Sequence, residues 1–266
     1  PGFCFPCILS LMQICNVHSL GIVEYKNTWD IQKDLAAEIA TSNHPPTLLL
    51  LEHPHVYSFG NQGNPENIIW DERELNRRRI DVQWSDRGGD VTYHGPGQLV
   101  GYPLLPLAEG KIRVDPTNGA VRLPKMDYVN YLRKLENVLI KTLFKYKIGG
   151  GQIKGQTGVW VQGDVPSRCV HCPPDIFNSP AKIASIGVKV DANGISRHGF
   201  ALNVSVDMNY WDGIIACGLE NQNKASMDYF LDPPPTIAEI SEVIIDAFGK
   251  EFSYEMKSTP LKEKIS

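Results

Sequence analysis

The segment from Arg87 to Gln98 has the residue types of a ligand-binding loop. Its sequence, Arg-Gly-Gly-Asp-Val-Thr-Tyr-His-Gly-Pro-Gly-Gln, contains four glycines, one proline, one arginine and one histidine. Glycine lets backbone N–H groups approach a ligand that a Cβ atom would exclude. Arginine adds a fixed cation, and histidine adds a group that titrates near neutral pH. Taken alone, the segment fits a Gly-rich hairpin with an incidental histidine better than it fits a ligand-binding loop.

Lys182 begins a second candidate segment, Lys-Ile-Ala-Ser-Ile-Gly-Val, whose other members are mostly apolar. An ammonium group close to a protein core tends to have a depressed pKa, and such lysines serve as general acids or bases. The alternative is a lysine at the end of a strand, with its stem on the core and its ammonium group in solvent. The segment His198-Gly-Phe-Ala-Leu-Asn203 follows it along the chain.

Cys217 lies in the third candidate segment, Gly-Ile-Ile-Ala-Cys-Gly. A small residue before the cysteine and a glycine after it suit an exposed, sharply turned nucleophile, with nearby amides available for an oxyanion. A buried structural cysteine is the alternative for a single thiol among apolar residues.

Two Cys-x-x-Cys pairs, Cys4/Cys7 and Cys169/Cys172, have the spacing found in zinc sites. They make a four-thiolate site only if the two pairs meet in space. We therefore expect neither a metal nor a cofactor.

Together and in this order, the segments resemble the signature of the lipoyl(octanoyl) transferases, the enzymes that start protein lipoylation. The matching blocks are Arg87-Gly-Gly-x-x-Thr-x-His-Gly-Pro-Gly-Gln, Lys182-Ile-Ala-x-x-Gly and His198-Gly-x-Ala-Leu-Asn, and Cys217-Gly stands at the nucleophile position. The likeness extends from about residue 13 to residue 252.

This resemblance implies an α+β fold, with a mixed sheet and packed helices, that is shared with biotin and lipoate protein ligases. It implies transfer of an octanoyl or lipoyl group from octanoyl-acyl carrier protein to a lysine of lipoyl domains. The acceptors would be those of 2-oxoacid dehydrogenases and the glycine cleavage H protein. The family's acyl-thioester cysteine and its partner lysine correspond to Cys217 and Lys182. The substrate-binding positions correspond to Arg87, Gly88, Gly89, Asp90, Val91, Thr92, Tyr93, His94, Ser185, Ile186, Gly187, His198, Gly199 and Phe200.

Two other functions remain open. An ATP-dependent lipoate or biotin ligase of the same fold activates the free acid as an adenylate and needs no cysteine nucleophile. A non-catalytic module that only binds carrier domains needs neither Cys217 nor Lys182. The presence of both residues favours the transferase.

The composition, 42% hydrophobic and 21% charged, is that of an ordinary globular protein. A formal net charge of −4 argues against a dedicated nucleic-acid binder. No apolar run approaches the roughly 18 residues that cross a bilayer, and no Lys or Arg precedes Lys26 as a signal peptide requires. We expect a cytoplasmic enzyme without membrane partners. Residues 1–11 are expected to be an extension, residues 12–255 a single catalytic domain and residues 256–266 a tail.

Hydrophobic periodicity predicts the elements that must position these segments. Helices and strands are mixed without a regular βαβ repeat, which favours an α+β domain. Thr28 is predicted to cap a helix that ends near Ala40, and Thr236 and Glu239 form a capping box that opens a helix through Phe248. Further helices are predicted at residues 71–78 and 126–146, and strands at residues 47–52, 80–85, 99–105, 157–161, 182–190 and 200–206.

Overall fold

The computed structural model describes residues 12–107, 113–114, 117, 121–122, 126–162, 170–173, 176, 179–216 and 223–261. Its helices are α1 (Tyr25–Ala40), α2 (Glu72–Arg77), α3 (Tyr128–Lys145) and α4 (Ile237–Phe252). Its strands are β1 (Gln13–Ile22), β2 (Thr47–Glu52), β3 (Val56–Phe59), β4 (Asp81–Trp84), β5 (Thr92–His94), β6 (Gln98–Leu104), β7 (Arg113–Val114), β8 (Val121–Arg122), β9 (Gly150–Ile153), β10 (Gln156–Val161), β11 (Ala181–Val190), β12 (Ser196–Asn203) and β13 (Tyr254–Ser258).

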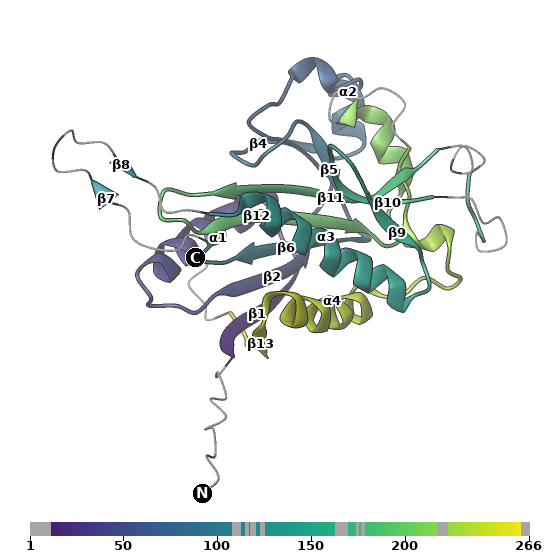
Figure 1. Cartoon of the computed structure of the whole chain (residues 1–266). Coiled ribbons are helices and arrows are strands. Elements are labelled where there is room, and N and C mark those ends of the chain that lie inside the picture. The colour runs from purple at the N-terminus through teal and green to yellow at the C-terminus, as the bar shows by residue number, and fades with distance from the viewer. Residues whose placement is uncertain are drawn as a thin grey trace, which may run out of the picture.

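An eight-stranded sheet in the order β13-β1-β2-β6-β12-β11-β10-β9 runs through the molecule (Figure 1). β1 pairs in parallel with β2 and β13, whereas β6, β12 and β11 pair in antiparallel fashion. A smaller sheet has the order β4-β3-β5. These mixed sheets with packed helices confirm the α+β prediction.

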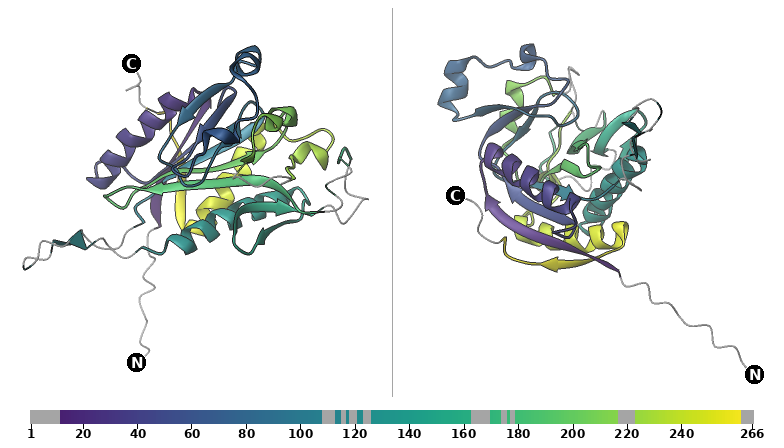
Figure 2. Two further views of the ribbon diagram at one scale, coloured as in Figure 1. Left: turned by 90° about the horizontal axis from the view of Figure 1, so that it is seen from above. Right: turned by 90° about the vertical axis from the view of Figure 1, so that its left-hand side faces the viewer.

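The leucines of β2 show why this strand is apolar throughout. Leu48 and Leu50 belong to a core cluster that includes residues of α3 and α4, whereas Leu49 and Leu51 pack with residues of α1. Successive side chains of a strand point to opposite faces, so a strand covered on both faces must be apolar at every position. Figure 2 shows α1 on one side of the sheet and α3 and α4 on the other.

Helix α1 begins earlier than predicted, because Thr28 is not its cap. The cap is Glu24, and the Thr28 hydroxyl donates to the Glu24 carbonyl oxygen at 3.0 Å from inside the first turn. A threonine hydroxyl that bonds to the carbonyl four residues back is compatible with a helix interior. The cap of α4 follows the prediction, since Thr236 and Glu239 form the capping box.

The predicted strands at residues 47–52, 157–161 and 182–190 are confirmed as β2, β10 and β11. The strand predicted at residues 200–206 is instead β12, Ser196–Asn203. β12 pairs with residues 184–190 of β11, from Ser196 opposite Val190 to Leu202 opposite Ala184. This pairing adds the four residues that the sequence pattern omitted.

The last described strand, β13, crosses the boundary expected at residue 255. It pairs in parallel with β1, from Tyr254 opposite Gln13 to Ser258 opposite Val17. Part of the expected C-terminal tail is therefore an edge strand of the main sheet. Among the described residues, no helix is both long and apolar enough to span a membrane.

Candidate active site

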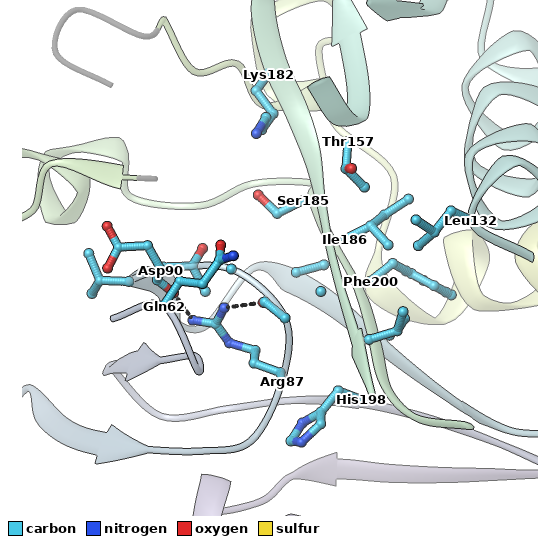
Figure 3. A pocket seen from close by; sticks show the side chains of 18 of the residues that line it. Gln62, Arg87, Asp90, Leu132, Thr157, Lys182, Ser185, Ile186, His198 and Phe200 are labelled. Atoms are coloured by element: carbon cyan, nitrogen blue, oxygen red, sulfur yellow. Dashed lines mark hydrogen bonds between the residues drawn. The ribbon is translucent and has the colours of Figure 1, made fainter. Parts of the chain in front are cut away.

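A cavity of about 440 Å³ opens between the Gly-rich segment, β11, β12 and the first turns of α3. Its volume is in the range of small-molecule sites. Lys182 lies at one end of the cavity, and Arg87 and His198 lie toward the other (Figure 3). His198 pairs with Val188, six positions along β11 from Lys182, so the two ends are about 20 Å apart along the strands.

Most of the predicted site residues line this cavity. They are Arg87, Gly88, Gly89, Asp90, Val91, Thr92, His94, Lys182, Ser185, Ile186, Gly187, His198, Gly199 and Phe200. Tyr93 is not among the lining residues; its side chain is buried in the core of the small sheet. Cys217 lies outside the described residues.

The Gly-rich segment rests directly on β11. The Gly88 N–H donates to the Val188 carbonyl oxygen at 3.0 Å, and Gly89 has φ +88°, in the region that favours glycine. A Cβ atom at Gly187 would lie 2.9 Å from the Gly88 carbonyl oxygen. The loop can therefore contact the strand this closely because residue 187 has no side chain.

The Arg87 side chain fixes the conformation of the Gly-rich loop through several hydrogen bonds. Its side chain is buried, and Nη2 donates to the Ser58 and Asp90 carbonyl oxygens, the latter at 2.7 Å. Nε donates to Ser58 Oγ at 3.2 Å, and Nη1 donates to the Gly88 carbonyl oxygen at 3.0 Å. The guanidinium thus joins the loop to β3.

His94, on the cavity wall, packs against Tyr25 and against a second buried histidine, His53, which does not line the cavity. The His53 ring also packs against Tyr25 and Tyr102. His53 Nδ1 donates to the Val23 carbonyl oxygen at 2.6 Å, so Nε2 accepts from the Tyr102 hydroxyl at 2.8 Å. Burial lowers the pKa of His53 to about 4 and that of His94 well below its usual value. Both imidazoles are therefore neutral near neutral pH.

His198 is held by contacts to two other elements. Its φ of +57° is unusual for a residue with a side chain, and its backbone N–H donates to Gln32 Oε1 at 2.6 Å. Its Nε2 donates to Asp86 Oδ1 at 2.9 Å, and Arg197 Nη2 donates to Asp86 Oδ2 at 2.6 Å. The hydrogen bond from His198, together with the charge of Arg197, lowers the pKa of Asp86. Burial lowers the pKa of His198.

The main chain of Lys182 is hydrogen-bonded to the segment at residues 223–225. Its N–H donates to the Asn223 carbonyl oxygen at 2.8 Å, and its carbonyl oxygen accepts from the Ala225 N–H at 2.9 Å. Its Nζ lies 4.7 Å from the centre of the Trp160 ring. The segment at residues 223–225 is thereby fixed beside the lysine.

The chain that leads to Cys217 is fixed beside the loop. The Ile215 N–H donates to the Asn67 carbonyl oxygen at 2.8 Å, and Ala216 is buried in the small-sheet core. The Asn67 side chain in turn donates to the Asp90 carboxylate, on the cavity wall. The two described ends that flank residues 217–222 are thus attached near two lining residues of the cavity, one end through Asn67 to Asp90 and the other to Lys182.

No group of three or more metal-binding side chains occurs in the described part of the chain. Of the cysteines in the Cys-x-x-Cys pairs, Cys4, Cys7 and Cys169 lie outside that part, and Cys172 Sγ lies 3.7 Å from the Tyr229 carbonyl oxygen.

Sequence reasoning missed several side chains that line the cavity, among them Tyr25, Tyr102, Tyr128 and Leu132. Tyr25 and Tyr128 are the first residues of α1 and α3. Tyr128 and Leu132 are four positions apart on the helical stripe of α3, which indicated a buried face but not what that face contacts. Tyr102 lies in β6, outside the blocks in which the sequence placed the site.

Residues 24–249 match the family described as the lipoyl protein ligase A/B catalytic domain. An octanoyltransferase of Chloroflexus aurantiacus is 38% identical over 92% of this chain and 96% of its own length. One of Christiangramia forsetii is 34% identical over 91% of this chain and 97% of its own length.

Among solved structures, a bipartite lipoate protein ligase system of Thermoplasma acidophilum matches 96% of this chain and 89% of its own, with a TM-score of 0.68 and 15% identity. That likeness supports the fold. Taken with the sequence relatives, it leads to one assignment: the chain belongs to the lipoyl protein ligase A/B catalytic-domain family and is an acyltransferase of the octanoyltransferase kind.

Proposed function

We propose that this enzyme transfers an octanoyl group from octanoyl-acyl carrier protein to a lysine of lipoyl domains, through a thioester on Cys217 with Lys182 as proton carrier. One observation carries the proposal: a single cavity is lined by the Gly-rich loop, the strand that begins near Lys182 and the segment that begins at His198. The location in the cytoplasm and the identity of the acceptor domains remain predictions.

The middle of the cavity suits an acyl chain. Leu132, Ile186 and Phe200 lie together on one side of it, between its polar ends (Figure 3). Burying the seven methylene and methyl carbons of an octanoyl tail contributes roughly 5 kcal/mol at about 0.8 kcal/mol per carbon.

The proposed chemistry balances over two steps. The Cys217 thiolate, favoured by a neighbouring ammonium, attacks the carbonyl carbon of the donor thioester. The C–S bond to the carrier breaks, and the departing thiolate takes a proton from Lys182. The acceptor amine then attacks the acyl-cysteine and gives a proton to Lys182, and the Cys217 thiolate leaves. Lys182 ends protonated, as it began.

The attachment of the flanking segments supports a pairing of Cys217 with Lys182. Asn223, the first described residue after residues 217–222, is hydrogen-bonded to the main chain of Lys182 itself. Ala216, the last described residue before them, follows Ile215, whose N–H is bonded to Asn67 beside Asp90.

Intact-protein mass spectrometry with octanoyl-acyl carrier protein tests the proposal. We expect a mass gain of one octanoyl group that hydroxylamine removes and that is absent from Cys217→Ala. Cys15→Ala is the matched control, because Cys15 is fully buried in β1 and burial raises the pKa of its thiol to about 12. The adduct should persist in that variant.

Absence of an adduct on the native chain, combined with ATP–pyrophosphate exchange in the presence of free octanoate, would replace the proposal with an adenylating ligase. Absence of both activities would leave carrier-domain binding as the function.

A further inference from the structure

A chain of buried hydrogen bonds runs from His94 to the segment beside Lys182. His94 Nδ1 lies 2.7 Å from Gln98 Oε1, and Gln98 Nε2 donates to Asn203 Oδ1 at 2.9 Å. Asn203 Nδ2 donates to the Ala225 carbonyl oxygen at 2.9 Å, and the Ala225 N–H bonds to Lys182. His94, Gln98 and Asn203 are each less than 10% exposed.

Two backbone carbonyls fix the direction of every bond in this chain. The Ala225 carbonyl oxygen can only accept, so the Asn203 amide must turn its NH₂ group toward Ala225 and its oxygen toward Gln98. The Tyr93 carbonyl oxygen also accepts from Gln98 Nε2, at 3.2 Å. Reversing the Gln98 amide would place its oxygen against two other oxygen atoms. Gln98 Oε1 therefore faces His94, and the proton of the imidazole lies on Nδ1.

The opposite edge of the ring is consequently an acceptor. His94 lines the cavity, and in the described part of the structure its ring makes this one hydrogen bond, through Nδ1. Nε2 carries a lone pair and no proton, because the imidazole is neutral. It can accept a hydrogen bond from a ligand but cannot donate one to a thioester oxygen.

We propose that Gln98 and Asn203 are positioning residues, which hold the proton of His94 on Nδ1 so that Nε2 accepts a hydrogen bond from an N–H group of a bound substrate. This inference rests on the proposed function for the identity of the substrates. An octanoyl tail has no N–H group, so the donor is either an amide of the carrier's pantetheine arm or the amine of the acceptor lysine.

The first experiment reads the tautomer without any reaction. Long-range proton–nitrogen NMR spectra of the ¹⁵N-histidine-labelled protein report which ring nitrogen is protonated, and His94→Gln identifies the His94 signals. We expect the proton on Nδ1 in the native chain. In Gln98→Leu we expect the Nε2–H tautomer to become populated. A native His94 protonated on Nε2, or an unchanged pattern in Gln98→Leu, would overturn the proposal.

The second experiment separates the two half-reactions by rapid-quench mass spectrometry. Gln98→Leu should slow one half-reaction about tenfold, the size expected for loss of one hydrogen bond to a substrate. Slower acylation of the enzyme identifies the pantetheine amide as the donor, and slower transfer to the lipoyl domain identifies the lysine. Asn203→Leu should give a smaller loss, because the Tyr93 carbonyl still orients Gln98.

Val138→Ala controls for general loss of stability. Val138 is fully buried in the main core and does not line the cavity. It should leave both half-reactions unchanged below its unfolding temperature. Native rates in Gln98→Leu despite a changed tautomer would refute a role for His94 Nε2. If the native chain transfers no octanoyl group, the proposed function fails, and the NMR result alone then decides whether Gln98 sets the tautomer.

Discussion

The eight-stranded main sheet and the three-stranded small sheet of this enzyme are stabilised by different kinds of side chain. The core of the main sheet is mostly aliphatic, with Leu50, Leu139 and Ile244 fully or almost fully buried. The core of the small sheet is rich in aromatic residues, among them Tyr57 and Tyr93. Aliphatic contacts are non-directional, whereas a buried tyrosine adds a hydroxyl that must find a partner. The main core therefore stabilises the fold, and the small core orients segments beside the site.

Removing bulk from the main core should have the largest effect on stability. Leu139→Ala removes a fully buried side chain of α3 and should cost about 4 kcal/mol of unfolding free energy. Urea denaturation measures this loss. Octanoyl transfer per folded molecule should stay within about twofold of the native rate, because the change creates a cavity remote from the site. A greater loss of transfer would show that the main core also orients the reacting groups.

His53, which lies between β2 of the main sheet and β3 of the small sheet, should make stability depend on pH. Its folded pKa of about 4 lies below the ordinary value of 6.5. The unfolded chain therefore binds the proton first, and stability is lost as the pH falls from 6.5 toward 4. The full loss is about 3 kcal/mol at 1.36 kcal/mol per pKa unit. Urea denaturation at pH 7.5 and pH 4 should show a smaller acid-induced loss in His53→Gln. An equal loss in both proteins would contradict this assignment.

Loss of one hydrogen bond in the small core should lower the unfolding free energy least of these changes but should clearly reduce activity. Tyr57→Phe removes the hydroxyl that donates to the Tyr210 carbonyl oxygen at 2.5 Å, at a cost of about 1 kcal/mol. Because Tyr210 precedes the segment that leads to Cys217, octanoyl transfer should fall about tenfold through misplacement of the reacting groups. Steady-state kinetics measures this fall. Tyr146→Phe, at the end of α3, should leave the rate unchanged, and equal rates in both variants would remove the distinction between the two cores.

Patterns local in sequence predicted much of this structure. The apolar run of β2 and the capping box of α4 each depend on a few adjacent residues. The Gly-rich block correctly predicted which segment lines the cavity. It did not predict that part of the segment is a strand, in which only alternate side chains face the cavity. Thr92 and His94 line the cavity while Tyr93, between them, points to the other face of β5.

Contacts distant in sequence were not predictable in this way. Gln98, which bonds to His94, is itself held by Asn203 of β12, 105 positions along the chain, and Tyr25 reaches the cavity from the start of α1. The edge strand β13 is only five residues long, and its pairing with β1 identifies it. Such features depend on which separate elements pack together in the fold. A short stretch of sequence does not contain that information.

The parallel pairing of β13 with β1 has a consequence for how the protein folds as it is synthesised. His18 in β1 and Thr259, just past β13, are hydrogen-bonded but lie 241 positions apart. At about 5 to 20 residues per second, the ribosome takes roughly 10 to 50 seconds to make that stretch. Throughout this interval one edge of β1 has no strand to cover it, and open strand edges invite pairing with other chains. We expect the nascent chain to be most prone to aggregation in this period, which ends when its last strand docks.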